Sequence, residues 1–146
     1  MQLYFCPMVE IRLLQWPQAK EAASRIRFTV FVEEQRVPAE IELDEHDAAC
    51  LHALAFDADG QALGTGRLLP DGHIGRMAVS RHARSKGVGG AILGALVEAA
   101  RQRGDREVVL AAQTHAIDFY RRHGFVEEGA EYEEAGILHR DMRRRF

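Results

Sequence analysis

Apolar and polar residues alternate along several short stretches of the chain, and each such stretch predicts a β-strand. Residues 9–14 alternate in part and predict the first strand. Residues 52–56 and 62–69 predict two more, and residues 57–60 (Asp-Ala-Asp-Gly) between them are typical of a hairpin connection. A Pro-Asp-Gly turn signal then precedes a fourth predicted strand at residues 74–79.

Apolar residues recur at helical spacing in two further stretches. Pro17 suits the first position of a helix, and residues 17–35 predict that helix. Pro38 prevents its continuation, so the acidic residues 40–47 are expected to be irregular. A longer helix is predicted to begin near Gly87 and to end before a glycine at position 104. Its apolar positions are Val88, Ala91, Ile92, Ala95, Leu96 and Ala99.

The last third of the chain predicts strands around one short helix. Residues 108–112 are almost all apolar, as in a strand buried on both faces. Thr114 is expected to cap a helix that ends at Gly124, and residues 125–126 and 136–142 predict closing strands. This order of elements predicts an α/β (mixed α+β) fold in which helices pack against a mixed sheet.

Composition fits one soluble domain of 146 residues, with 47% hydrophobic residues, 28% charged residues and a net charge of -3. This charge gives no overall positive field for nucleic acid, and the run 143–145 (Arg-Arg-Arg) is interpreted as a solvated tail. Cys6 and Cys50 match no zinc, redox or disulfide pattern, so a reducing cytoplasm is the expected setting. No apolar stretch is long enough to span a membrane.

The first residues are a poor signal peptide, since they have no basic start and no proper apolar run. The ordered pattern begins just after Met8. Residues 1–7 are therefore interpreted as a disordered segment or as a misassigned start, with Met8 as the alternative first residue.

A basic loop with glycines joins the fourth predicted strand to the long helix. The first N–H groups of a helix have no partner within it and lie at the positive end of its dipole, so they can bind an anion. Gly87 and Gly89 let the backbone approach phosphate oxygens, and Arg84 and Lys86 add positive charge. The loop therefore predicts a phosphate site.

Other interpretations of this loop stay open if it is taken alone. It is not a P-loop, because no Gly-Lys-Ser/Thr follows at the required spacing. Gly87, Gly89 and Gly90 do not give the Gly-x-Gly-x-x-Gly spacing of a dinucleotide-binding fold. The glycines can also serve only to let a helix pack closely on a strand.

Two motifs resemble those of the GCN5-related N-acetyltransferases (GNAT). Arg84-x-x-Gly87-x-Gly89 is similar to the acyl-CoA signature of that family, Gln/Arg-x-x-Gly-x-Gly/Ala, and occupies its place between a strand and a long helix. Residues 119–125 (Phe-Tyr-Arg-Arg-His-Gly-Phe) resemble a later helix of the family. Residues 30–35, 74–79 and 132–142 further resemble the YjcF/ElaA-like branch. The resemblance covers nearly all of residues 1–146, taken as one N-acetyltransferase domain.

This resemblance implies a GNAT-like domain with a mixed, mostly antiparallel central sheet, splayed central strands and flanking helices. It implies acetyl-CoA as the acyl-donor cosubstrate, whose pantetheine arm would pair with the backbone of residues 77–79 as an added strand does. The residues implied in donor binding are Met77, Ala78, Val79, Arg84, Ser85, Lys86, Gly87, Val88, Gly89, Gly90 and Phe119.

The implied reaction is direct attack of a neutral amine on a thioester in a ternary complex. Tyr120 matches the family tyrosine that gives a proton to the departing sulfur, and a phenol is protonated at neutral pH. Glu34 is slightly favoured as the base, and Gln113 is better suited to positioning. The remaining candidates are Glu33, Asp44, His46, His115 and His139.

The sequence is consistent with three classes of function. The first is an N-acetyltransferase acting on a small-molecule or protein amine; the second is an acyl-CoA sensor without turnover; the third is an interaction protein whose glycine turn is structural. Residues 40–47 would suit a cationic acceptor, although an acidic loop is usually only solvated. The scattered histidines show no metal-ligand spacing, so we expect no metal. Neither nucleic acid nor a membrane is expected as a partner, and the resemblance implies a homodimer.

Overall fold

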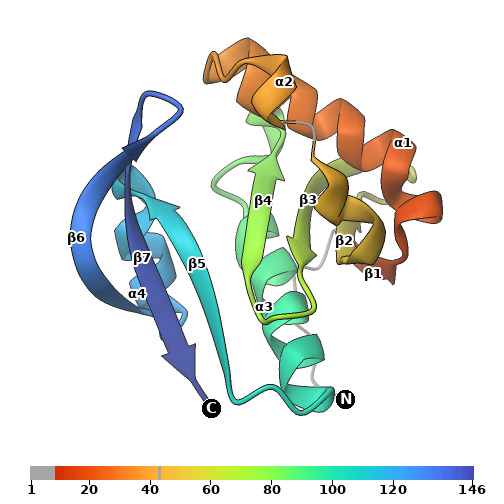
Figure 1. Cartoon of the computed structure of the whole chain (residues 1–146). Coiled ribbons are helices and arrows are strands. Elements are labelled where there is room, and N and C mark those ends of the chain that lie inside the picture. The colour runs from red at the N-terminus through yellow and green to blue at the C-terminus, as the bar shows by residue number, and fades with distance from the viewer. Residues whose placement is uncertain (1–8, 43) are drawn as a thin grey trace.

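The computed structural model describes residues 9–42 and 44–146 (Figure 1). The predictions about residues 1–7 and about Met8 as the first residue lie outside the described residues.

The first sheet has four strands in the order β1-β2-β3-β4, and each neighbouring pair is antiparallel. The strands are β1 (Glu10–Leu14), β2 (Leu51–Phe56), β3 (Ala62–Leu68) and β4 (Ile74–Val79). All four were predicted to within a few residues. The predicted connection at residues 57–60 is also confirmed, since the Gly60 N–H donates to the Asp57 carbonyl at 3.0 Å.

Helices cover both faces of this sheet. Along β2, Ala53 and Ala55 belong to the apolar cluster that contains the long helix α3 (Val88–Gln102), whereas Leu54 belongs to the cluster of α1 (Trp16–Arg27). Successive side chains of a strand point to opposite faces, so β2 lies between the two helices. This double cover explains why β2 is apolar along most of its length.

The predicted helix at residues 17–35 is continuous but changes its winding. Residues Trp16–Arg27 form α1, with the predicted Pro17 in the first turn. Residues Phe28–Glu34 continue as a π-helix (η1), which ends where the Gln35 N–H donates to the Val30 carbonyl at 3.1 Å. A π-helix rotates side chains relative to an α-helix and often marks a functional site. Here it directs the last residues of the segment toward β4.

The acidic segment 40–47 is more regular than the sequence predicted. It contains a short helix, α2 (Ala39–Glu42), and a 3₁₀ helix, η2 (Glu45–Ala49). The expectation of an irregular segment was wrong because it considered local propensity alone. Long-range ion pairs to residues on α1, β3 and β4 order this segment.

The second sheet contains β5 (Glu107–Gln113), β6 (Val126–Glu134) and β7 (Ile137–Arg145) in the order β5-β7-β6. A 3₁₀ helix, η4 (Thr114–Ala116), leads into α4 (Ile117–Arg122). The prediction that Thr114 caps a helix is wrong, because Thr114 is already inside η4 and the residue before α4 is Ala116, without a side-chain cap.

Strands β4 and β5 are neighbours that diverge (Figure 1). Among the described residues they are linked by an isolated parallel bridge between His73 and Val109, beside the start of β4. The N–H of Val109 also donates to the Gly72 carbonyl at 3.1 Å. Toward the ends of both strands the two sheets separate. The predicted splayed, mostly antiparallel arrangement is thus confirmed.

Candidate active site

Two pockets share one wall at the end of β4. The inter-sheet pocket, of about 850 Å³, lies between η1, β4, β5 and the start of β7. The glycine-loop pocket, of about 670 Å³, lies against residues 83–91 and α4. Both pockets are lined by Met77, Ala78, Val79, Arg84 and Tyr120. Two molecules bound in the two pockets would therefore meet at these residues.

The glycine-loop pocket is lined in part by three glycines, Gly87, Gly89 and Gly90, at the start of α3. Gly87 precedes α3 with a φ of 84°, in the left-handed region, and α3 begins at Val88. Its first N–H groups have no carbonyl partner within the helix, so they can bind an anion. A Cβ added at Gly89 would lie 3.5 Å from the Phe119 ring, so the ring lies close to the first turn of α3. Oxygen atoms of a phosphate fit this arrangement of glycines and N–H groups.

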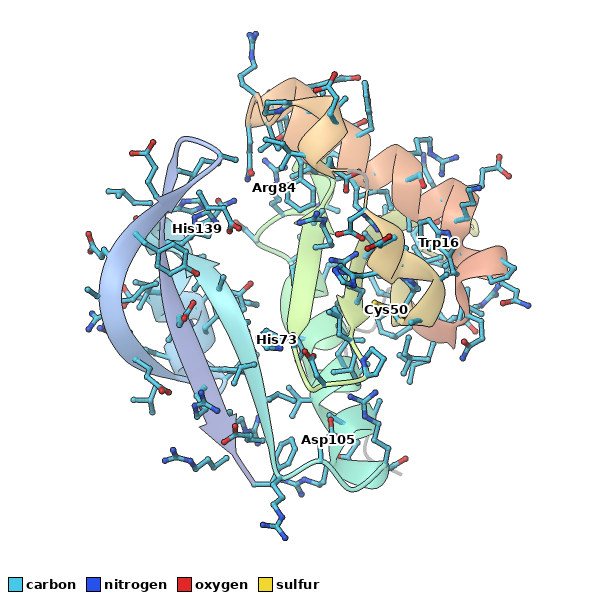
Figure 2. The ribbon with its side chains drawn as sticks, in the orientation of Figure 1. Trp16, Cys50, His73, Arg84, Asp105 and His139 are labelled. Atoms are coloured by element: carbon cyan, nitrogen blue, oxygen red, sulfur yellow. The ribbon has the colours of Figure 1, made fainter. Side chains whose placement is uncertain are left out.

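Arg84 lines both pockets and lies near the end of β4 (Figure 2). Its Nε donates to the Val79 carbonyl at 2.9 Å, and its Nη2 donates to the Glu34 carboxylate at 2.6 Å. Arg81 lies farther away, with Nη2 at 3.8 Å from the same carboxylate oxygen. An ion pair thus links the π-helical segment to the loop that was predicted to bind phosphate.

Tyr120 is buried on α4 and lines both pockets. Its ring meets Phe119 edge-on at a centroid distance of 5.1 Å and Phe125 at 6.0 Å. Burial raises the pKa of the Tyr120 hydroxyl to about 12. The group therefore carries its proton at neutral pH and can donate it at the shared wall.

The comparisons with known proteins agree with this geometry. The Acetyltransferase (GNAT) domain family matches residues 18–146. The chain belongs to the GNAT family of N-acetyltransferases. It is 41% identical to the "Uncharacterized N-acetyltransferase YjcF" of Bacillus subtilis (strain 168) over 121 residues, or 80% of this chain and 86% of the relative.

Solved structures of similar proteins show the same fold. An acyl-CoA N-acyltransferase from Pseudomonas aeruginosa superposes with a TM-score of 0.83 at 33% identity, covering 93% of this chain and 99% of that one. Escherichia coli ElaA gives a TM-score of 0.82 at 30% identity, covering 94% and 99%. The predicted membership of the YjcF/ElaA-like branch is thereby confirmed.

In this GNAT chain, nearly all the residues predicted at the donor line the glycine-loop pocket. They are Met77, Ala78, Val79, Arg84, Ser85, Gly87, Val88, Gly89, Gly90 and Phe119. Lys86 lies exposed on the same loop and is not among the lining residues. Sequence reasoning missed Arg122 and His123, which also line this pocket. The signal was present, because both residues lie inside the Phe-Tyr…Gly-Phe motif.

The predicted residues of the acceptor side also come together. The inter-sheet pocket is lined by Glu34, Asp44, His46, Gln113, His115 and His139, whereas Glu33 is not among its lining residues. Gln113 exchanges two amide hydrogen bonds with Gln35, of 2.9 and 3.3 Å. This pair joins the end of η1 to the end of β5, across the space between the sheets.

A buried ion network supports one wall of the inter-sheet pocket. Arg27, which is only 2% exposed, donates to Glu42 at 2.6 Å and to Asp47 at 2.8 Å. Arg67 donates to Asp44 and to Asp47, at 2.8 and 2.9 Å. The network is buried on the side of α1 and reaches the pocket through the carboxylates of Glu42 and Asp44.

Arg76 completes this network at the pocket surface. Its Nη2 donates to the Asp44 carboxylate at 3.1 Å and to the Glu42 carbonyl at 3.2 Å. Burial alone would raise the pKa of Asp44, but the bonds and charges of Arg67 and Arg76 lower it to about 2. Three arginines thus face the three carboxylates of Glu42, Asp44 and Asp47. The acidic segment therefore does not present these carboxylates as a free acidic surface for a cationic acceptor.

Sequence reasoning missed all three arginines of the network. A partial signal existed, since Arg27 follows the buried Ile26 in α1 and Arg67 lies inside an apolar strand. A charged side chain in such a position is expected to be paired. The partners of Arg27 and Arg67 lie 15 to 23 residues away along the chain, too far for any local pattern to identify them.

The part of the chain that the structure describes contains neither a candidate metal site nor a helix that could span a membrane. Within residues 9–42 and 44–146, no three His, Cys, Asp or Glu side chains gather in a way that could hold a metal ion. In the same part of the chain, no helix has the length and apolar character needed to cross a membrane.

Proposed function

We propose that this protein transfers an acetyl group from acetyl-CoA to an amine, by direct attack in a ternary complex. The observation that carries the proposal is the wall shared by the two pockets, with Tyr120 and the last residues of β4 on both sides of it. A donor in the glycine-loop pocket and an acceptor in the inter-sheet pocket would have their reacting groups at this wall.

The donor side of the proposal assigns each residue a task. The N–H groups at the start of α3, with Arg84, Ser85, Lys86 and the glycines, would bind the pyrophosphate. The backbone of residues 77–79 would pair with the pantetheine arm. When bound, acetyl-CoA supplies a thioester, whose carbonyl carbon is open to a nucleophile. Phe119 would pack beside it, since its ring lies close to Gly89 and lines the same pocket.

The proton transfers are assigned to residues of the shared wall and of the acceptor pocket. Tyr120 would donate its proton to the departing sulfur, and its burial keeps that proton in place at neutral pH. The sequence slightly favoured Glu34 as the base. Its carboxylate is bonded to Arg84 at 2.6 Å, so it would have to leave that arginine before it could accept a proton from an amine.

Two measurements test this proposal. Acetyl-CoA at about a hundred times its Kd should raise the free energy of unfolding by about 2.7 kcal/mol, because a ligand selective for the native state stabilises it. S-Acetylpantetheine, which lacks the pyrophosphate, should stabilise the protein much less. Release of free CoA thiol should then follow addition of an acceptor from a panel of small-molecule amines and peptides.

The outcomes separate the candidate functions. No stabilisation at saturating acetyl-CoA would reject the donor site. Stabilisation without thiol release from any amine would favour the acyl-CoA sensor, the alternative to an enzyme. One domain over residues 1–146, a cytoplasmic location and a homodimer stay predictions from the sequence.

A further inference from the structure

His139 is a buried histidine that faces the inter-sheet pocket from β7. It is 9% exposed and lies among the lining residues of that pocket. In Figure 2 it lies on the second sheet, at the same end of the molecule as Arg84 and across the space between the sheets. Of the three histidines that line the pocket, His46 and His115 are exposed, whereas His139 is buried.

The hydrogen bond of His139 fixes its tautomer. Its Nδ1 lies 2.7 Å from the carbonyl oxygen of Ile137. A carbonyl oxygen can only accept, so Nδ1 must carry the proton in this bond. In the neutral imidazole the other nitrogen, Nε2, then has a lone pair and acts as an acceptor. The backbone of β7 thus prepares Nε2 to take up a proton.

His139 lies between Tyr132 of β6 and Gln113 of β5 in the second sheet. Tyr132 stands opposite His139 in the β6–β7 ladder, and the two rings stack with a centroid distance of 5.9 Å and an interplanar angle of 18°. The Tyr132 hydroxyl donates to Asp141 at 2.6 Å, which fixes the tyrosine ring in turn. On the other side Gln113 stands opposite His139 in the β5–β7 ladder. The Ile137 carbonyl and the Tyr132 ring therefore orient the imidazole.

Three of the carboxylates that line the pocket with His139 are paired with arginines and are therefore less available as bases. Glu34 accepts from Arg84, while Glu42 and Asp44 belong to the arginine network. Arginines aside, the other titratable groups that stack on the imidazole or line the pocket with it are Tyr132 and Glu134 on β6, His46 on η2, His115 on η4 and Tyr120 on α4. Among them Tyr120 carries a proton at neutral pH and serves better as an acid.

We propose that His139 is the catalytic base for the acceptor amine, a role that rests on the acetyl transfer proposed above. As the amine nitrogen forms its bond to the thioester carbonyl carbon, an N–H bond of that amine breaks and Nε2 takes the proton. The C–S bond then breaks, and the sulfur takes a proton from Tyr120. Solvent removes the proton from the imidazolium and restores that of Tyr120, so atoms and charge balance.

Replacement of His139 by Gln tests this role. The glutamine amide can still donate to the Ile137 carbonyl but cannot take up a proton, so the single-turnover rate should fall by roughly 10²-fold. The stabilisation by acetyl-CoA should be unchanged. The matched control is His73→Gln, since His73 is an exposed histidine bonded to Asp71 at the opposite end of β4 from Arg84 (Figure 2). It should keep the wild-type rate.

Two further readouts distinguish a base from a structural histidine. The acidic limb of the pH–rate profile should be altered in His139→Gln and retained in His73→Gln. Imidazole added to His139→Ala should restore part of the lost rate, whereas the less basic 1,2,4-triazole should restore less. If His139 had only a structural role, its replacement would leave the acidic limb of the pH–rate profile unchanged. The rate of His139→Ala would then not depend on the basicity of the added azole.

The tautomer can be tested without an acceptor. Nitrogen-15 spectra of the wild-type protein above pH 8 should show His139 protonated at Nδ1 and free at Nε2. A proton on Nε2 instead, or a wild-type single-turnover rate in His139→Gln, would overturn the assignment while leaving the acetyl transfer intact. If the wild-type protein binds acetyl-CoA but releases no thiol with any amine, the proposed function fails, and the role of His139 with it.

Discussion

The glycine-loop pocket and the inter-sheet pocket differ in how they are made. The first is lined by three short runs of the chain, within residues 77–79, 83–91 and 119–123, and offers an anion backbone N–H groups and glycines. The second collects side chains from segments between residues 30 and 139. A site made by residues that follow one another in the sequence leaves a motif there. A site made by converging side chains does not, because its residues meet only after folding.

The inter-sheet pocket also depends on charges beneath its wall. Asp44 and Glu42 form ion pairs with arginines of α1, β3 and β4. The wall of this pocket therefore depends on ion pairs between residues far apart in the sequence. The glycine-loop pocket rests mainly on the apolar packing of α3. The two pockets should therefore respond differently to loss of a buried charge, and the largest expected effect follows from that difference.

Replacement of Arg27 by Met should destabilise the wall of the inter-sheet pocket and give the largest effect. The substitution leaves two buried carboxylates, Glu42 and Asp47, without their main partner, and loss of one member of a buried ion pair costs about 3–5 kcal/mol. The free energy of unfolding in urea measures this loss. Arg12→Met is the control, since Arg12 pairs with Glu10 on the surface, where a pair contributes about 0–1 kcal/mol. Equal losses in the two variants would contradict the importance of the network.

Acid should weaken the same network. Burial raises the pKa of Asp44 and Asp47, but their arginine partners outweigh it, so both pKa values are lower in the folded protein than in the unfolded chain. Their contribution to stability is therefore complete above the unfolded pKa of about 3.9 and is lost as the pH falls toward 2. Urea midpoints measured from pH 5 to pH 2 should decrease, and the decrease should be smaller in Arg27→Met. A parallel decrease in both proteins would assign the acid sensitivity to other carboxylates.

Tyr120→Phe should separate chemistry from binding at the wall that the pockets share. The ring contacts with Phe119 and Phe125 remain, so the protein should fold and still be stabilised by acetyl-CoA. Loss of the proton donor should lower the single-turnover rate by roughly 10²-fold or more. An unchanged rate, measured where chemistry is limiting, would remove Tyr120 from the mechanism.

The sequence predicted the two pockets unequally for physical reasons. Gly87 and Gly89 follow a strand and begin a helix, so strand, loop and helix signals agree within a few residues. Local alternation also predicted where the first four strands lie along the chain. By contrast, Arg27 and Arg76 meet Glu42 only through tertiary packing. The 3₁₀ turn at Thr114 and the π-helix after Arg27 were also missed, because packing rather than local propensity sets their winding.

Gly87→Ala tests the glycine-loop pocket, and Gly104→Ala is its control. Gly87 has a φ of 84° and Gly104 a φ of 97°, and no heavy atom lies within 4 Å of a Cβ added at either position. Alanine at either site should therefore destabilise the protein by roughly 1–2 kcal/mol through backbone strain alone. Only Gly87→Ala should also weaken acetyl-CoA binding, measured by calorimetry, because its backbone forms the loop. Equal donor affinities in the two variants would indicate that Gly87 serves only the left-handed turn before α3.

Glu34→Gln carries the smallest expected effect and probes the contact between the pockets. Arg84 is bonded to Glu34, and a partly exposed ion pair contributes about 0.2–1 kcal/mol. A pyrophosphate that competes for Arg84 has to replace this pair, so Glu34→Gln should tighten acetyl-CoA binding by up to about fivefold. The effect should shrink at high salt.

Glu33→Gln is the control, because it removes the same charge one residue away, from an exposed side chain outside the lining of either pocket. Weaker donor binding in Glu34→Gln alone would mean that Glu34 holds Arg84 in the orientation that the donor requires. The single-turnover rate of the same variant decides the remaining question. If His139 is the base, that rate should stay near the wild-type value, whereas a loss of about 10²-fold would transfer the role to Glu34.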